Sequence, residues 1–215
     1  MSLWSEFLTN QERPIHKWVH YFPIYERHFS GFVNRAATFI EIGVSKGGSL
    51  QLWKRYLGPF AQIVGIDNES SCKALEEDQI AIRIGDQSNP IFLQRVIDEF
   101  KQPDVVLDDG SHLMSHMAAS FEFLYPRLSK NGVYMVEDLH TAYWEEYEGG
   151  FGRRGTFIER CKCFIDDLNA EHARGAVPIS EFTKSTLSMH FYDSAVVFER
   201  GQHVKKHAPV IGRPA

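Results

Sequence analysis

Short apolar runs rich in β-branched residues alternate with segments of helical periodicity along most of this chain. The runs at 38–44, 62–67, 80–84, 104–107 and 132–136 predict five strands. Helices are predicted at 49–57, 90–100, 113–128 and 156–173. Because strands joined by helices of this length require right-handed crossovers, the pattern predicts a mostly parallel sheet with helices on both faces.

The end of the chain departs from this alternation. Two further strands are predicted at 187–192 and 195–199, and only Asp193 and Ser194 join them. So short a link must form a hairpin, which we expect to place one antiparallel strand at the sheet edge. The expected fold is therefore α/β and Rossmann-like, with a mostly parallel seven-stranded sheet and a C-terminal antiparallel hairpin.

Length and composition fit one domain. The 215 residues, 43% of them hydrophobic, can bury one sizeable core, so we expect a single domain over 1–215. Within it, 1–36 is expected to be a helical segment that covers the site. Residues 139–155 form a candidate lid because aromatics, acids and glycines are mixed there, although an ordinary loop explains them equally well.

Charge and hydropathy exclude several classes of function. A net charge of −5, with no basic cluster longer than a pair, argues against a nucleic-acid partner. No apolar run reaches the ~20 residues of a membrane helix, and the N-terminus lacks a signal-peptide core, so a cytoplasmic protein is expected. The cysteines at 72, 161 and 163 are interpreted as structural thiols. A homo-oligomer is left open.

A glycine-rich turn follows the first predicted strand. The segment EIGVSKGGS at 41–49 has the spacing G-x-x-x-G-G, which is neither the dinucleotide fingerprint nor the phosphate loop. Glycines let the backbone bend sharply beside a ligand, and a helix N-terminus follows. A small ligand with a carboxylate or a nucleoside fits this turn, and a tight turn without a ligand is the alternative.

Acids end the next two predicted strands. Asp67 could accept hydrogen bonds from ribose hydroxyls, and Asp86 could meet an adenine amino group or instead cap the helix at 90. Together these markers resemble class I S-adenosylmethionine (SAM)-dependent methyltransferases. The resemblance implies that SAM is the cofactor and that it contacts the turn and the neighbouring strand ends, at Glu41, Gly43, Ser45, Gly47, Asp67, Asp86, Gln87 and Asp108.

Paired carboxylates end the fourth and fifth predicted strands, as Asp108-Asp109 and Glu137-Asp138. Adjacent strands lie ~4.8 Å apart, so four acids would meet at one edge and repel one another. A divalent cation, Mg²⁺ before Mn²⁺ or Ca²⁺, would remove that cost. Alternatively, some of these acids cap helices or form salt bridges, as Asp109 could for the helix near 113.

His112 lies close to these acids and could accept a proton from a substrate hydroxyl. His116 follows one turn later and is more often a surface histidine than a zinc ligand. His140 is the next candidate base.

Three motifs narrow the resemblance. The segments DDGSH, VEDLHTAYW and HFYDSAVVFE, with the N-terminal HKWVHY and YERHF, resemble the metal-dependent sugar O-methyltransferases of macrolide biosynthesis, the mycinamicin and tylosin type. The resemblance implies a sugar-like hydroxyl acceptor, a metal held by Asp109, Glu137 and Asp138, and His112 as general base. Larger relatives carry an additional N-terminal domain, for which we expect no room here.

Three other functions are compatible with parts of this sequence. A nicotinamide-dependent oxidoreductase could use a related sheet, but the dinucleotide fingerprint is missing. A non-catalytic SAM- or metal-binding subunit would leave the acid and histidine set without a role. A methoxylation helper resembling the cephamycin-pathway methyltransferase is a further alternative.

Overall fold

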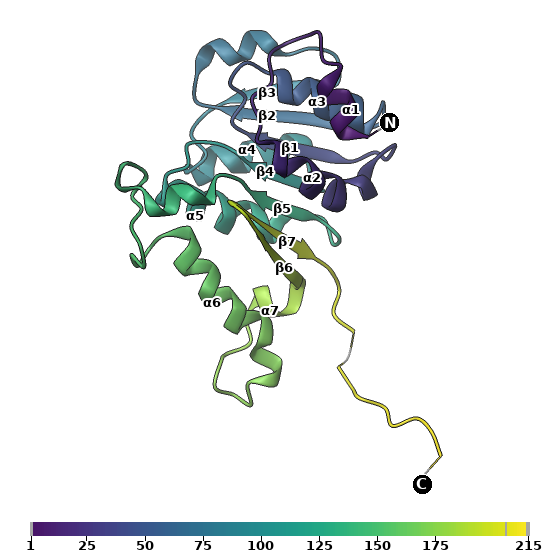
Figure 1. Cartoon of the computed structure of the whole chain (residues 1–215), viewed down its shortest axis with the longest axis vertical. Coiled ribbons are helices and arrows are strands. Elements are labelled where there is room, and N and C mark those ends of the chain that lie inside the picture. The colour runs from purple at the N-terminus through teal and green to yellow at the C-terminus, as the bar shows by residue number, and fades with distance from the viewer. Residues whose placement is uncertain (1, 205, 214–215) are drawn as a thin grey trace.

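A computed structural model describes residues 2–204 and 206–213. Its centre is a seven-stranded sheet in the order β3-β2-β1-β4-β5-β7-β6 (Figure 1). The strands are β1 Thr38–Ile42, β2 Gln62–Asp67, β3 Ile80–Ile84, β4 Val105–Asp108, β5 Val133–Val136, β6 Thr186–Tyr192 and β7 Ala195–Arg200. The predicted fold class is confirmed, and strand ends differ from the predicted ones by two residues at most.

The first five strands are mutually parallel. β7 is antiparallel to both β5 and β6. The reversed strand therefore lies one position inside the sheet, and the edge strand β6 runs parallel to β5. The prediction that the antiparallel strand itself would be at the edge was wrong, because the second strand of the hairpin, not the first, pairs with β5.

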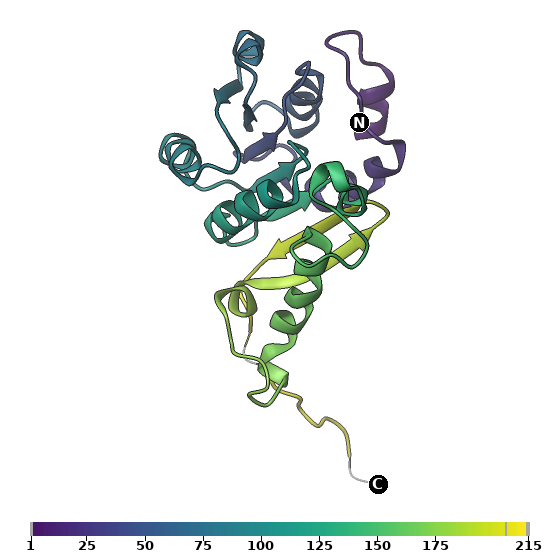
Figure 2. The same ribbon diagram turned by 90° about the vertical axis from the view of Figure 1, so that its left-hand side faces the viewer.

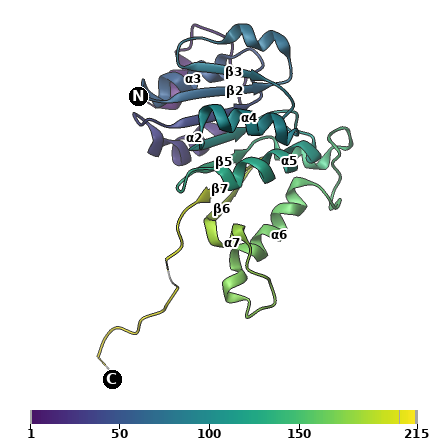
Figure 3. The ribbon, with the colours of Figure 1, turned by 180° about the vertical axis from the view of Figure 1, so that it is seen from behind.

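Helices cover both faces of the sheet. They are α1 Leu3–Leu8, α2 Phe22–Phe29, α3 Gly48–Leu57, α4 Pro90–Phe100, α5 Met114–Leu124, α6 Phe157–Asn169 and α7 Glu181–Ser185. α1, α2 and α3 pack on one face, around Trp53 and Phe39. α4, α5 and α6 pack on the other, around Phe121 and Tyr134 (Figures 2 and 3). No helix among the described residues is long and apolar enough to span a membrane.

Side chains of each strand alternate between these two layers. Val105 and Leu107 of β4 face α1–α3, whereas Val106 faces α4–α6. The same alternation continues to the strand ends and decides which layer each terminal acid enters.

Short 3₁₀ helices lie in the connections. They are η1 Val19–Tyr21, η2 Ser30–Phe32, η3 Ser70–Leu75, η4 Tyr125–Arg127, η5 Leu139–Tyr143, η6 Glu145–Tyr147 and η7 Ala170–His172. η4 and η7 account for the ends of the helices predicted over 113–128 and 156–173, where the last turn tightens. After β7, residues 201–204 and 206–213 lead away from the sheet (Figure 1).

Candidate active site

Two adjacent cavities lie at the carboxyl ends of the parallel strands, where ligands bind in folds of this class. The larger, about 410 Å³, is lined by residues 14–18, the turn at 43–49 and the acids Asp109, Glu137 and Asp138. The smaller, about 230 Å³, is lined by Asp86, Gln87 and neighbouring strand ends. Gly43, Asp67 and Gly110 line both cavities, so one extended ligand can reach from one into the other.

The glycine-rich turn is held by close packing. Gly43 has a φ of +97°, and a Cβ there would lie 2.0 Å from the carbonyl oxygen of Asp109. A Cβ on Gly48 would lie 2.3 Å from the carbonyl oxygen of Pro14. These glycines therefore let β1, the loop after β4 and the N-terminal segment approach one another, whatever the ligand.

Asp67 fixes the shape of this turn. Its Oδ2 accepts hydrogen bonds from the backbone N–H groups of Val44 at 2.8 Å and Ser45 at 3.1 Å. Its Oδ1 accepts from the N–H of Glu69 at 2.9 Å. Asp67 thus lies where both cavities meet and already organises the backbone around them.

At the smaller cavity, Asp86 accepts hydrogen bonds from the N–H and hydroxyl of Ser88, which lower its pKa. The cap of α4 is Asn89, whose side chain accepts from two backbone N–H groups. Asp86 therefore does not cap that helix and remains at the cavity wall.

Asp108 turns away from the cavities into the core. It is 1% exposed and accepts hydrogen bonds from Ser120 Oγ at 2.5 Å, Tyr134 OH at 3.0 Å and Gln87 Nε2 at 3.0 Å. Burial raises its pKa. Through Gln87, whose Oε1 accepts from the N–H of Ser111, Asp108 supports the loop that carries Asp109 and His112.

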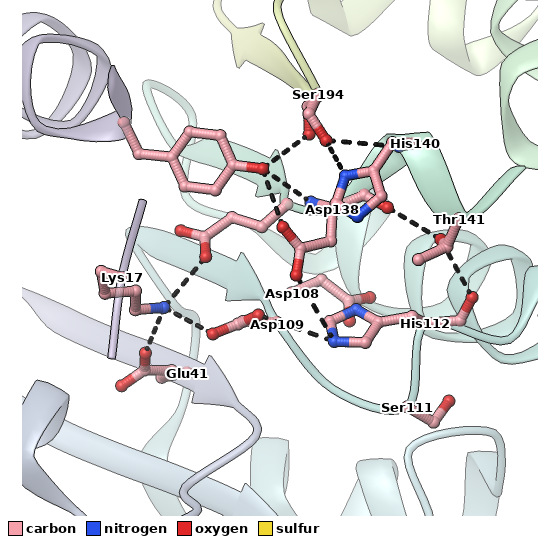
Figure 4. Close-up of polar contacts among 12 residues, drawn as sticks. Lys17, Glu41, Asp108, Asp109, Ser111, His112, Asp138, His140, Thr141 and Ser194 are labelled. Carbon is pink, nitrogen blue, oxygen red and sulfur yellow. Dashed lines mark hydrogen bonds and ion pairs between the residues drawn. The ribbon is translucent and has the colours of Figure 1, made fainter. Parts of the chain in front are cut away.

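A buried ammonium group joins three of the acids. Lys17 Nζ lies 2.6 Å from Asp109 Oδ2, 3.0 Å from Glu137 Oε2 and 3.2 Å from Glu41 Oε1 (Figure 4). Burial alone would lower the pKa of Lys17, but the negative charges of Asp109, Glu137 and Glu41 outweigh it and hold that pKa well above its ordinary value. Lys17 is therefore charged and neutralises part of the acidic cluster.

The hydrogen-bond partners of Glu41 and Glu137 complete this cluster. Ser49 Oγ donates to Glu41 at 2.8 Å, and the Tyr25 hydroxyl donates to Glu137 Oε1. Both carboxyl groups are buried, and burial raises their pKa against the opposing attraction of Lys17.

A second group faces the larger cavity. One potential ligand atom from each of Asp109, His112 and Asp138 lies within 4.8 Å of the others. His112 Nε2 is 3.9 Å from Asp109 Oδ1 and 3.7 Å from Asp138 Oδ2 (Figure 4). Its Nδ1 is buried with no hydrogen-bond partner in the described part of the chain. The Tyr21 hydroxyl donates to Asp138 at 2.8 Å and fixes that carboxylate.

The backbone is strained at this group. His112 has a φ of +60° and Asp138 a φ of +53°, in the left-handed region that few residues other than glycine adopt, although histidine and aspartate do so more often than most. Such strain persists where surrounding contacts impose it, and it clusters at functional sites.

The predicted site residues thus fall into three environments. Asp109, Asp138 and His112 come together at the larger cavity, whereas Glu137 faces Lys17 and Tyr25, and Asp108 enters the core. Asp109 does not cap α5, because no side chain caps that helix at Leu113. His116 contacts Ser111 through Nδ1 rather than pairing with His112.

Sequence reasoning assigned no role to Lys17, Tyr21 or Tyr25. Lys17 lies 92 residues from Asp109 and 120 from Glu137, so no local pattern links them. The available signal was the HKWVHY segment, which carried the resemblance without showing where its lysine points.

The candidate lid packs against the loop after β4. Glu148 accepts a hydrogen bond from the N–H of Ser115, and the Tyr147 ring lies 6.1 Å from that of His112. Tyr143 and Trp144 are about half exposed. Closure over a substrate stays a prediction.

Comparisons with known proteins agree with this geometry, although no protein-family model matches the chain. It is 35% identical to an 8-demethyl-8-α-L-rhamnosyl tetracenomycin-C 2′-O-methyltransferase of Streptomyces olivaceus, over 86% of this chain and 51% of that protein. It is 31% identical to the mycinamicin VI 2″-O-methyltransferase of Micromonospora griseorubida, over 93% and 53%. The chain spans about half the length of these curated relatives.

Solved structures give the same result. The structure of MycE methyltransferase from the mycinamycin biosynthetic pathway, in complex with Mg, SAH and mycinamycin VI, superposes with a TM-score of 0.80 and 30% identity. The match covers 93% of this chain and 53% of that one.

The fold and these matches define the class: the chain has the fold of the class I methyltransferases and is similar over most of its length to members of that class. Within that class its homologues are O-methyltransferases that modify sugars of glycosylated natural products. The resemblance predicted from its motifs is confirmed.

Proposed function

We propose that this chain is a SAM- and Mg²⁺-dependent O-methyltransferase that acts on a sugar hydroxyl of a glycosylated natural product. The observation that carries the proposal is the position of Asp109, His112 and Asp138 at the cavity formed by the glycine-rich turn. The acceptors named for its relatives, rhamnosyl tetracenomycin and mycinamicin derivatives, support the acceptor class. A cytoplasmic location, a small-molecule rather than nucleic-acid or membrane partner, and a homo-oligomer stay predictions.

The two connected cavities suit SAM. In this assignment the turn at Gly43, Ser45 and Gly47, with Glu41 beneath it, meets the methionine part. Asp67 receives ribose where the cavities join, and Asp86 and Gln87 flank adenine in the smaller cavity.

The residues at the larger cavity also fit a divalent cation. Carboxylate oxygens are the ligands that Mg²⁺ prefers, and Asp109 and Asp138 are each about one-fifth exposed, so an ion could reach them. Glu137 would join them only by exchanging part of its contact with Lys17. When bound, the cation would act as a Lewis acid that makes a hydroxyl easier to deprotonate.

His112 is the proposed general base. Its Nε2 would accept the hydroxyl proton, while Asp109 and Asp138 stabilise the positive charge that the ring gains. The Tyr21 hydroxyl holds Asp138 by a hydrogen bond. The loop that carries His112 is held by a hydrogen bond from the N–H of Ser111 to Gln87. The base is therefore positioned before substrate arrives.

The experiment is methyl transfer from labelled SAM to mycinamicin VI and to the rhamnosyl tetracenomycin acceptor, with EDTA and then with added Mg²⁺. Asp109→Asn and Asp138→Asn should raise the Mg²⁺ concentration needed for activity by ~10-fold or more. His112→Ala should slow transfer by ~10²–10⁴-fold with an unchanged Mg²⁺ requirement.

The outcomes separate the parts of the proposal. Full activity in EDTA would reject the metal. A His112→Ala variant that shifts the Mg²⁺ requirement as far as Asp109→Asn does would make the histidine a ligand rather than the base. Calorimetric binding of S-adenosylhomocysteine without transfer to any acceptor would leave a SAM-binding subunit. Binding of NADH without binding of S-adenosylhomocysteine would favour an oxidoreductase.

A further inference from the structure

A second group of metal-ligating side chains lies away from the candidate active site, between α2 and the C-terminal hairpin. It consists of His28 on α2, His190 on β6 and Glu199 on β7, which we call the hairpin triad. One potential ligand atom from each residue lies within 4.8 Å of the others. The function proposed above gives these residues no role.

Individual contacts in the hairpin triad are already close to those of a metal centre. His28 Nδ1 lies 2.8 Å from Glu199 Oε1, and His190 Nε2 lies 3.3 Å from Glu199 Oε2. A tetrahedral zinc ion with bonds of about 2.0–2.1 Å holds its ligand atoms ~3.3 Å apart. Two imidazoles and one carboxylate are also a ligand set that zinc uses in proteins.

The contacts around the hairpin triad orient its ligands. The other nitrogen of His28, Nε2, lies 2.8 Å from the hydroxyl oxygen of Tyr192, which can accept a hydrogen bond from Nε2–H, and in that tautomer Nδ1 is free to coordinate. Ser188 Oγ donates to Glu199 Oε2 at 2.7 Å. Such outer hydrogen bonds fix ring orientation and tautomer at protein metal sites.

The hairpin triad can also be reached by an ion. His28 is buried, but the side chains of His190 and Glu199 are 27% and 36% exposed. An ion could therefore enter from the hairpin side and keep one position for water, as zinc sites with three protein ligands do.

We propose that His28, His190 and Glu199 bind one Zn²⁺ ion that fastens α2 to the β6–β7 hairpin. Zn²⁺ would coordinate Nδ1 of a neutral His28 ring whose single proton lies on Nε2 and faces Tyr192, so a proton on Nδ1 before binding moves to Nε2 and none is lost from the ring. The ion thus connects the N-terminal segment, which also carries Lys17 and Tyr21, to the end of the sheet.

The test is Zn²⁺ titration calorimetry with the full chain at neutral pH. Because Asp109, His112 and Asp138 offer a second set of zinc ligands, every variant is made in an Asp109→Asn/Asp138→Asn background. The readout in this background is Zn²⁺ binding alone, so the result does not depend on whether the protein transfers methyl groups. We expect one Zn²⁺ per chain.

Three variants decide the assignment. His190→Ala should abolish the binding, and Tyr192→Phe should weaken it by about 10–100-fold through the lost outer contact. His172→Ala, which removes an exposed histidine elsewhere, should leave it unchanged. Circular dichroism checks that each variant is folded. Absence of Zn²⁺ binding in the background protein, or equal binding in folded His190→Ala, would overturn the proposal.

Discussion

Replacing Lys17 by methionine tests whether one buried ammonium group holds the acidic strand ends together. Its Nζ lies 2.6, 3.0 and 3.2 Å from carboxylate oxygens of Asp109, Glu137 and Glu41. At an effective dielectric constant of about 20, each contact is worth about 5–6 kcal/mol. Desolvation offsets several kcal/mol for each buried ion, so removing the cation should cost a net ~3–5 kcal/mol.

The measurements are urea unfolding and thermal melting of the wild type, Lys17→Met and a control, Lys54→Met. Lys54 lies 2.9 Å from Glu77, but its side chain is 30% exposed, so losing that pair should cost only about 0–1 kcal/mol. For a domain of this size, the Lys17 variant should melt ~6–20 °C lower.

Added Mg²⁺ provides a second measurement on the same variants. Without Lys17, three carboxyl groups lack their counter-ion, so Mg²⁺ should raise the melting temperature of Lys17→Met more than that of the wild type. Equal loss of stability in the two lysine variants would refute the argument that Lys17 compensates these acids.

Two further predictions concern the glycine-rich turn and the acid pair of β4. Gly43→Ala should weaken S-adenosylhomocysteine binding by calorimetry and lower unfolding free energy by roughly 1–3 kcal/mol, because its Cβ would meet the Asp109 carbonyl at a φ of +97°. Unchanged binding would show that the turn can relax. Asp108→Asn should lose roughly 1–3 kcal/mol of stability in urea with an unchanged Mg²⁺ requirement, because its partners are core donors. Asp109→Asn should instead raise the Mg²⁺ concentration needed for activity, and an equal Mg²⁺ requirement in the two variants would contradict their separate roles.

Local sequence patterns were sufficient to predict most of the fold. The strands β2 and β3 and the helix α4 begin and end at the predicted residues, because periodicity, proline and glycine act over a few residues. The position of β7 inside the sheet was missed, since which hairpin strand pairs with β5 depends on contacts that no local pattern encodes.

The site was predicted less completely, for a related reason. The turn and the strand-end acids were found because each follows a strand in the sequence. The residues that compensate those acids come from the N-terminal segment, and nothing near Lys17, Tyr21 or Tyr25 in the sequence indicates a carboxylate partner. Their roles follow only from the packing of that segment over β1 and β5.

Side chains alternate between the two faces of the sheet along β4 and β5, which explains why the four acids at the ends of these strands do not act as one set. Glu137 continues the side-chain row of Val133 and Met135 and therefore enters the layer of α2, where Lys17 and Tyr25 receive it. Asp108 continues the row of Val106 and enters the opposite layer under α5.

The acids just beyond the two strands, Asp109 and Asp138, place ligand atoms beside His112, whereas Glu137 lines the same cavity with its carboxylate held by Lys17 and Tyr25. Among the described residues Lys17 contacts Asp109 but not Asp138, so the Asp138 carboxylate keeps its negative charge available to an incoming cation. The strand period thus divides a repulsive cluster into a core acid, a compensated acid and a pair suited to Mg²⁺.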